Sequence, residues 1–285
     1  MVQRSSSLTR ILGLAAATAL LVSGTIAGAP TASSVPTVEG ATSAGNRAAD
    51  GRLAPVLLPN ARALPAAKFY IRRDGSGHRV LRFESGLAST GRGPLEVRPN
   101  DLGNCGPNRQ HASQILYRDR DRNRWYKRSV DKKVARRDAG CIVFHPSHDH
   151  WHFEAAARYA LWDPDRRREP VVVSRRKMSF CLRDTEKVPP RWATRDYPQH
   201  YGDCHRGTPQ GISIGWVDIY GNYLPGQFLT LPNAMPTGLY CMRTTVDPTH
   251  ALRESSDTDN SSVRSIRISG ERVTLKPFRR CRSVL

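Results

Sequence analysis

Short runs of alternating apolar and polar residues, divided by Gly, Pro, Asn and Asp, fill most of the chain after residue 67. The runs KFYIRR (68–73) and RVLRFES (79–85) flank DGSGH, which is a strong hairpin signal. We find no long stretch with helical periodicity beyond a turn near 128–137. The pattern predicts an all-β fold, an antiparallel β-sandwich-like domain with long loops. Further strands are predicted in ARYALWD (157–163), PVVVS (170–174), KMSFCLRD (177–184), GWVDIYG (215–221), QFLTL (227–231), LYCMRTTVD (239–247), VRSIRIS (263–269) and RVTLKPF (272–278).

The N-terminal segment differs from this pattern. Residues 1–30 carry Arg4 and Arg10 before an apolar run, and small residues follow, which is the layout of a secretory signal peptide. A single membrane anchor is the alternative, but the run is short and rich in Ala and Gly. Residues 31–61 read as a disordered linker, which leaves one domain over 62–285. We therefore expect a secreted, extracellular protein that contacts a membrane only through an uncleaved signal anchor.

Six cysteines follow the leader, and none forms a CxxC pair. An even number in an exported chain predicts three disulfides that staple the domain. Six cysteines allow 15 connectivities, and pairing in sequence order is our hypothesis. Structural zinc is the alternative, although the spacing is unlike that of a zinc ribbon or finger. The six are Cys105, Cys141, Cys181, Cys204, Cys241 and Cys281.

The chain of 285 residues has a formal net charge of +19. Its densest basic stretch, residues 117–138, is interrupted by aspartates and carries no nucleic-acid-binding motif, so we do not expect a nucleic-acid partner. We read this stretch as a charged hairpin or loop. Attraction to anionic cell-surface polymers, or simply solubility, explains the charge.

Four of the nine histidines lie in FHPSHDHWHF, residues 144–153. Side chains alternate along a strand, so His148, His150 and His152 should project from one face, about 7 Å apart in succession. Three imidazoles on one face suit copper or zinc. His145 breaks the alternation and is expected to orient a ligand or fill space. A histidine-rich surface tract without a fixed site is the alternative.

The cluster and its surroundings resemble the copper-binding segment of the lysyl oxidases, which are copper amine oxidases that act on peptidyl lysine. The shared motif is a histidine, two residues and His-x-His-x-His, leading into a strand with a tyrosine, here Tyr159. HRVLRFESGLASTGRGPLEVRP resembles the upstream strand and loop, and KMSFCLRD and QGISIGWVDIYG resemble the segments that carry the cofactor lysine and tyrosine. The resemblance extends over about residues 69–270.

The resemblance implies a built-in quinone, lysine tyrosylquinone, formed from Lys177 and Tyr220 with the help of copper and oxygen. It also implies copper ligands at His148, His150 and His152. Such a cofactor oxidises a primary amine or peptidyl lysine to an aldehyde, and molecular oxygen then reoxidises it with release of ammonia and hydrogen peroxide. The family has an aspartate where Asp218 stands, two residues before the tyrosine on the same strand face, and we predict it to be the base. A structural hydrogen-bonding role for this aspartate is equally open.

The chain departs from the family at several positions. Ser147 stands where animal members have a cysteine, and Trp216 and Gly226 stand where a disulfide brackets the cofactor tyrosine. Cys181 and Cys204 match family cysteines and must pair differently. These changes concern the rigidity around Tyr220 and not the ligands. The stretch RESSDTDNSS resembles a family calcium site through Glu254, Asp257 and Asp259, with an acidic turn as the alternative.

Three functions are compatible with these observations. The first is a secreted amine oxidase that depends on copper and lysine tyrosylquinone. The second is a non-catalytic secreted copper-binding protein, which would need only the histidines. The third is a metal-dependent hydrolase with Glu154 as its base, which would need neither Lys177 nor Tyr220. The presence of both residues favours the first.

Overall fold

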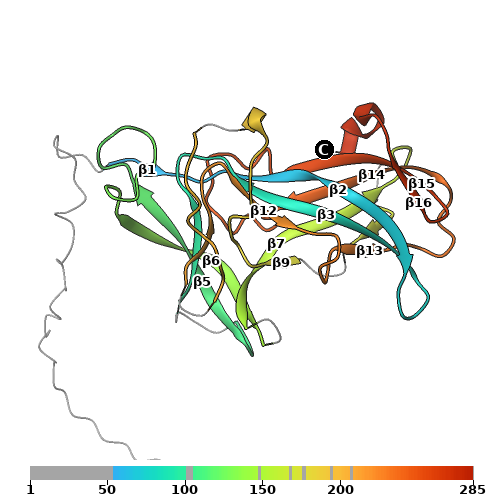
Figure 1. Cartoon of the computed structure of the whole chain (residues 1–285), viewed down its shortest axis with the longest axis horizontal. Coiled ribbons are helices and arrows are strands. Elements are labelled where there is room, and N and C mark those ends of the chain that lie inside the picture. The colour runs from blue at the N-terminus through green and yellow to red at the C-terminus, as the bar shows by residue number, and fades with distance from the viewer. Residues whose placement is uncertain are drawn as a thin grey trace, which may run out of the picture. The chain divides into compact units, whose positions relative to one another are not determined.

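The computed structural model describes residues 54–100, 105–146, 149–166, 169–174, 178–192, 195–205 and 208–284. The predicted signal peptide and residues 31–53 of the predicted linker lie outside these ranges. The described part is made of antiparallel strands in two sheets (Figure 1). The prediction of an all-β antiparallel fold is therefore confirmed.

The larger sheet has eleven strands, and its central order is β11-β4-β5-β6-β7-β14-β15-β16, with β1, β8 and β9 joined at the side. Its strands are β1 (Val56–Leu57), β4 (Leu95–Asn100), β5 (Arg109–Arg118), β6 (Lys133–His145), β7 (His150–Trp162), β8 (Val172–Val173), β9 (Met178–Phe180), β11 (Gln210–Ile212), β14 (Gly238–Val246), β15 (Ser261–Ser269) and β16 (Arg272–Leu275).

The smaller sheet has five strands in the order β10-β12-β3-β13, with β2 also paired to β3. They are β2 (Ala61–Arg73), β3 (Arg79–Ser89), β10 (Glu186–Lys187), β12 (Trp216–Tyr220) and β13 (Phe228–Thr230). Two short 3-10 helices, η2 (Pro190–Trp192) and η3 (Phe278–Val284), complete the described elements.

The hairpin predicted from DGSGH joins β2 and β3. The Asp74 carboxylate accepts the backbone N–H groups of Ser76 and His78, both at 2.9 Å, and so closes the turn. Gly77 has a φ of 77°, a backbone conformation that would be strained in a residue with a side chain. The local sequence therefore supplies both the cap and the conformation that this turn requires.

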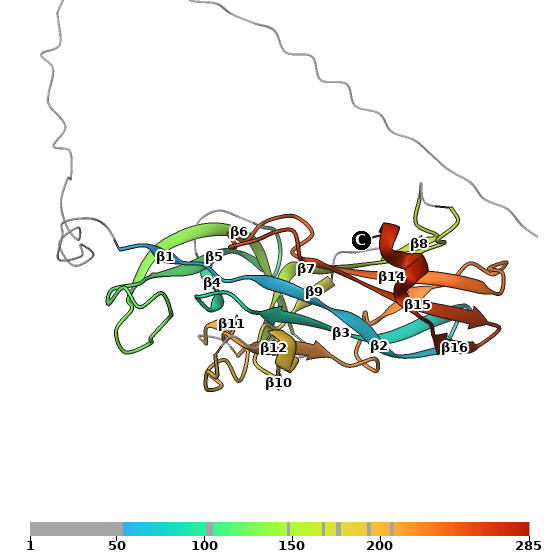
Figure 2. The same ribbon diagram turned by 90° about the horizontal axis from the view of Figure 1, so that it is seen from above.

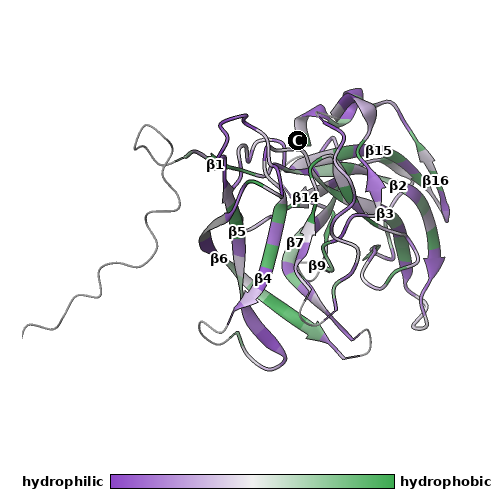
Figure 3. Cartoon of the chain, turned by 60° about the vertical axis from the view of Figure 1, so that its left-hand side comes forward, coloured by the Kyte–Doolittle hydropathy of each residue, from purple (hydrophilic) through white to green (hydrophobic). Residues whose placement is uncertain are grey.

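One apolar core lies between the two sheets. It joins Leu81 and Phe83 of β3 to Phe153 and Leu161 of β7, all almost fully buried. Figure 2 shows β2 and β3 running along β14 and β15, and Figure 3 shows apolar and polar segments along single strands such as β4. The alternation read from the sequence separates buried from exposed positions only in part, since Leu95, Glu96 and Val97 of β4 are all buried.

A buried hydrogen-bond group ties the sheets together inside this core. The Tyr159 hydroxyl of β7 lies 2.6 Å from the Ser85 hydroxyl of β3 and 2.9 Å from the Gln227 amide nitrogen. The Tyr159 ring also meets Phe83 edge to face, with centroids 4.7 Å apart. Polar groups buried at this depth need partners, so the three side chains fix how the sheets meet.

Three disulfides join the cysteines in sequence order, as predicted. They are Cys105–Cys141, Cys181–Cys204 and Cys241–Cys281. No free cysteine remains. Structural zinc bound by these cysteines is therefore excluded.

The structure corrects two predictions. Strand β1 lies inside the predicted linker and pairs with β5, and Leu57 and Ala61 are buried. A strand of two apolar residues is stable here because it pairs with the backbone of β5. The helical turn near 128–137 is reduced to one turn, in which the Val130 and Asp131 N–H groups bond to the Lys127 carbonyl before β6 begins.

Residues 117–138 form the end of β5, a loop and the start of β6, as expected of a charged hairpin. Among the residues that the structure describes, no helix has the length and apolar character needed to cross a membrane.

We expect Tyr159→Phe to lower the free energy of unfolding by about 1–3 kcal/mol, because it leaves buried polar groups of Ser85 and Gln227 short of a partner. Chemical denaturation monitored by fluorescence measures this. Tyr223→Phe is the matched control, since Tyr223 is 76% exposed, and should change stability by less than about 0.5 kcal/mol. Equal effects of the two changes would contradict the role of the buried group.

Candidate active site

Two of the predicted ligand histidines converge at the start of β7. His150 and His152 lie on one strand face, and their Nε2 atoms are 2.9 Å apart. Two ligand nitrogens on metal bonds of about 2.0 Å at right angles would be separated by about 2.9 Å. The spacing therefore fits two cis ligands of one transition metal ion.

The other two histidines of the cluster, His148 and His145, do not lie on the regular part of β7. His148 lies outside the described residues, so its role as a ligand stays a prediction. Asp149 has a φ of 52° and β7 begins at His150, so the predicted alternation is observed from His150 to His152 and stays a prediction for His148. His145 pairs with His150 across β6 and β7, and its ring centroid lies 4.3 Å from that of His152. His145 thus packs against a candidate ligand, as the sequence predicted.

Ser179 of β9 holds the other side of the His152 ring. Its hydroxyl oxygen lies 3.4 Å from His152 Nδ1, so Nε2 is the nitrogen that faces His150. Groups that bond the second ring nitrogen orient a ligand histidine and set its tautomer. The sequence analysis missed this serine. Its place between the predicted lysine and Phe180 was the only available signal.

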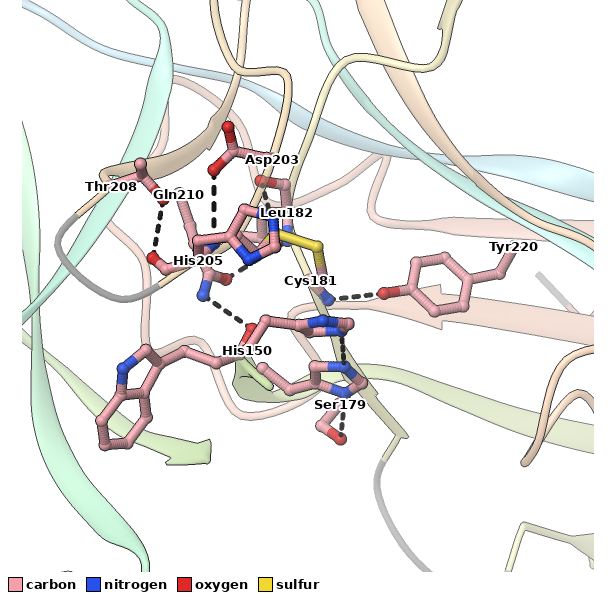
Figure 4. Close-up of a disulfide and its surroundings, with 12 residues drawn as sticks. His150, Ser179, Cys181, Leu182, Asp203, His205, Thr208, Gln210 and Tyr220 are labelled. Atoms are coloured by element: carbon pink, nitrogen blue, oxygen red, sulfur yellow. Dashed lines mark hydrogen bonds between the residues drawn. A yellow bond between two sulfur atoms is a disulfide. The ribbon is translucent and has the colours of Figure 1, made fainter. Parts of the chain in front are cut away.

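Tyr220, the last residue of β12, meets the same strand from the other side. Its hydroxyl accepts a hydrogen bond from the Cys181 backbone N–H, and its ring stacks on Phe180 with centroids 3.8 Å apart and planes 10° apart. Figure 4 shows the hydroxyl pointing at Cys181, with the His150 ring on the far side of that residue. Residues 179–181 thus lie between the histidines and Tyr220.

The Cys181–Cys204 disulfide fastens this segment to the loop after Tyr201 (Figure 4). The Cys204 carbonyl accepts the Trp151 N–H at 3.2 Å, and the Gln210 side chain donates to the Trp151 carbonyl at 2.7 Å. The backbone between His150 and His152 is therefore tied to the same loop. Lys177, the predicted partner of Tyr220, lies outside the described residues and immediately precedes β9.

Asp218 lies two residues before Tyr220 and is 1% exposed. Neither carboxylate oxygen has a hydrogen bond of normal geometry to the residues that the structure describes. Burial raises the pKa of Asp218 well above its usual range, and the Arg183 guanidinium opposes the shift without cancelling it. The Arg183 backbone N–H is the one group that partly stabilises its charge by hydrogen bonding among the described residues, and a carboxyl group buried with so little support is costly, which is typical of a group retained for chemistry.

The same environment acts on Tyr220. Burial, and then the Asp218 carboxylate, raise the pKa of the Tyr220 phenol well above its usual value. The phenol is therefore neutral at physiological pH. Asp218 and Tyr220 lie two residues apart on β12, so the alternation of the strand gives them the same face.

Two other predicted groups are already engaged. The Glu154 carboxylate is paired with Arg109 at 2.7 Å, so it is not poised as a free base beside the histidines. Glu254 accepts hydrogen bonds from the Ala61 N–H and the Asn260 amide, and burial raises the pKa of Glu254 to about 8. Calcium binding near Glu254 stays a prediction.

We expect His150→Ala and His152→Ala each to weaken Cu²⁺ binding by at least tenfold, since each removes one of two converging nitrogens. Ser179→Ala should weaken it by about tenfold, by releasing the His152 ring. Competition against a chromogenic chelator measures the affinities.

Ser76→Ala in the exposed β2–β3 turn is the control and should bind as the native chain does. Native affinity in both histidine variants would show that the metal, if bound, lies elsewhere.

Comparison with known proteins identifies the same segments. The model of the family described as Lysyl oxidase matches residues 113–278, which is more than half of the chain. That range includes both described histidines, Ser179, Asp218 and Tyr220.

Individual relatives are more distant. Human protein-lysine 6-oxidase is 29% identical over 141 residues, which cover 47% of this chain and 31% of the relative. Human lysyl oxidase homolog 3 is 27% identical over 132 residues, covering 46% of this chain and 16% of the relative, and lysyl oxidase homolog 2 from Gallus gallus is 28% identical with the same coverage. The chain therefore spans less than a third of these relatives, and the match of the family model over most of its folded body shows that it belongs to the lysyl oxidase family.

Proposed function

We propose that this chain is a secreted amine oxidase that depends on copper and on lysine tyrosylquinone formed from Lys177 and Tyr220. Its reaction converts a primary amine or peptidyl lysine, with oxygen and water, into an aldehyde, ammonia and hydrogen peroxide. Three disulfides support export to an oxidising compartment. The charge of +19 leaves attraction to anionic surface polymers as a further expectation.

The observation that carries the proposal is the position of residues 179–181. Ser179 contacts His152, and the next two residues contact Tyr220 through a stacked ring and a backbone N–H. The strand that begins one residue after Lys177 therefore runs between the candidate copper ligands and the candidate quinone precursor. A site that forms its cofactor from a lysine and a tyrosine requires this proximity.

The chain's own residues have separable roles. His150 and His152, with His148 as the third predicted ligand, would hold copper. The quinone, when formed, supplies an electrophilic carbon that ordinary side chains lack. Phe180 holds the Tyr220 ring by stacking, and the Cys181 N–H fixes the direction of its hydroxyl. Asp218, inside the protein and shielded from water, would accept the proton lost from the carbon next to the substrate nitrogen.

The two alternatives are less well supported. A hydrolase would use Glu154 as its base, and that carboxylate is paired with Arg109. A copper-binding protein without activity would have no need for the buried Asp218 next to Tyr220, because a buried carboxyl group without a hydrogen bond of normal geometry to the described residues lowers stability. Family membership is also consistent with oxidation rather than hydrolysis.

Peptide mass mapping after expression with copper tests the cofactor directly. We expect a covalent link between the Lys177 and Tyr220 peptides in the copper-loaded protein and no link in a copper-free preparation. Tyr220→Phe should abolish the link and the release of hydrogen peroxide from a primary amine. Tyr223→Phe, which changes an exposed tyrosine nearby, should preserve both. Bound copper with the two peptides unlinked would favour the copper-binding alternative, and amine oxidation that survives Tyr220→Phe would exclude the quinone.

Replacement of Asp218 tests the base. Asp218→Asn should lower kcat by at least about a hundredfold, which is the usual contribution of a positioned base. Because burial raises the pKa of Asp218, its carboxyl group loses its proton at a higher pH than an ordinary aspartate does. Only the deprotonated form can act as a base, so native activity should rise as the pH passes through the raised pKa of Asp218.

Stability should change in the opposite direction. Because the pKa of Asp218 is higher in the folded than in the unfolded state, protonated Asp218 contributes to the stability of the fold. This contribution is complete below the unfolded pKa of 3.8 and is lost as the pH rises through the folded pKa. Thermal melts of Asp218→Asn should lack this acid-side dependence. Unchanged kcat would assign Asp218 a purely structural role.

A further inference from the structure

A cavity lies apart from the candidate active site. It has a volume of about 570 Å³ and is lined by residues 126–129 from the β5–β6 loop, residues 197–201, the pair Ser213 and Ile214, and Pro94. None of the described residues assigned to metal, quinone or base lines it. A cavity of this volume is large enough for a small organic molecule.

Two buried aspartates hold the walls of this cavity in place. Asp131 accepts the backbone N–H of Lys127 at 2.7 Å and that of Arg120 at 2.9 Å. Asp184 accepts the N–H groups of His200 and Tyr201 and also bonds the Ser213 backbone N–H and hydroxyl. The loops on both sides are therefore fixed by the fold before any ligand arrives, which lowers the cost of binding.

The lining offers flat aromatic surfaces. Tyr126, Tyr197 and Tyr201 come from two separate segments, and Pro94 and Ile214 add apolar area. The Tyr201 hydroxyl donates to the buried Glu96 carboxylate at 2.8 Å, so its ring is held against rotation. Rings fixed in this way pack well against a planar aromatic ligand.

The charges at the cavity are positive. Lys127 and Arg128 line it, and Arg128 makes no ion pair within the described part of the chain, whereas Lys127 is paired with Asp121 at 2.6 Å. Burial, and then the neighbouring Arg128, lower the pKa of His200, so His200 is neutral at physiological pH. An anionic ligand would find an uncompensated guanidinium here.

The acids near the cavity are all engaged inside the fold, Asp131 and Asp184 by the hydrogen bonds described above and Glu96 by three side chains. Glu96 is 2% exposed and is already bonded by Arg98 at 2.7 Å and by the hydroxyls of Tyr117 and Tyr201. The negative charge of Glu96 is thus compensated by its buried partners. No acidic side chain lines the cavity itself.

The Tyr197 hydroxyl is an independent sign of a missing partner. Its oxygen is buried and has no hydrogen bond of normal geometry to the described residues, although the Arg195 guanidinium lies near it. The Arg195 side chain interacts with this hydroxyl as a donor, and a ligand oxygen in the cavity would offer the hydroxyl an acceptor. A carboxylate oxygen would accept a hydrogen bond from it.

We propose that this cavity is a binding site for an aromatic carboxylate. The planar ring packs on the tyrosine, proline and isoleucine surfaces, and the carboxylate is held by Arg128 and by the Tyr197 hydroxyl. The site is separate from the amine-oxidising centre and does not depend on copper or on the quinone. The +19 charge of the chain adds attraction at long range.

Calorimetric titration of the full exported protein with 2-naphthoate tests the proposal. The neutral isostere 2-naphthalenemethanol is the matched ligand, and it should bind at least about tenfold more weakly, because it lacks the charge-assisted contact with Arg128. Saturable binding of one equivalent of the acid is expected. Equal affinity for the two ligands, or no saturable binding of the acid, would overturn the proposal.

Two variants locate the site. Arg128→Ala should weaken binding of 2-naphthoate by about tenfold, and Tyr197→Phe, which keeps the ring and removes the hydroxyl, by about threefold to tenfold. Arg272→Ala, an exposed arginine on β16, is the charge-matched control and should bind as the native protein does. Thermal melts establish that each variant is folded. Native affinity in both cavity variants would place the ligand elsewhere and refute this site.

Discussion

The position of β9 is the constraint on which the candidate site depends, because this three-residue strand has to meet both sheets. It pairs with β7 of the larger sheet through Phe153 and Phe180, while the Phe180 ring stacks on Tyr220 of the smaller sheet. Neighbouring side chains on a strand point in opposite directions, so Ser179 and Phe180 serve opposite sides. One strand thereby orders a histidine on one side and a tyrosine on the other.

The irregularity of β7 makes this arrangement possible. The register between β7 and β9 shifts between Phe153 and Ala157, and Ala155 has a φ of 54°. A bulge of this kind re-aims the strand and ends regular pairing, which is common beside active sites. The histidines therefore lie on the regular start of β7, and the tyrosine of the sheet-joining group, Tyr159, lies on its regular end.

Sequence predicted well whatever depends on near neighbours. Alternation located the strands around the β2–β3 hairpin and along β12 to β16, and the order of the cysteines led to the correct disulfides. The contacts of Ser179 and Asp184 could not be predicted, because their partners lie up to 29 residues away and depend on how the loops fold. The short β1 was missed for a similar reason, since only β5 stabilises it as a strand. The burial of Asp218 could likewise not be predicted from the sequence, because it results from the packing of the two sheets.

The Cys181–Cys204 disulfide gives the site an order of assembly. Cys181 donates its backbone N–H to Tyr220, and its sulfur closes the loop that also anchors Trp151 between the two histidines. While the thiols are reduced, nothing covalent holds that loop against β9, and the segment around Trp151 and Tyr220 is held by hydrogen bonds and packing alone. Oxidation of this pair must therefore come before the geometry of the site is complete. The Cys181–Cys204 disulfide thus ties the complete geometry of the candidate site to an oxidising environment.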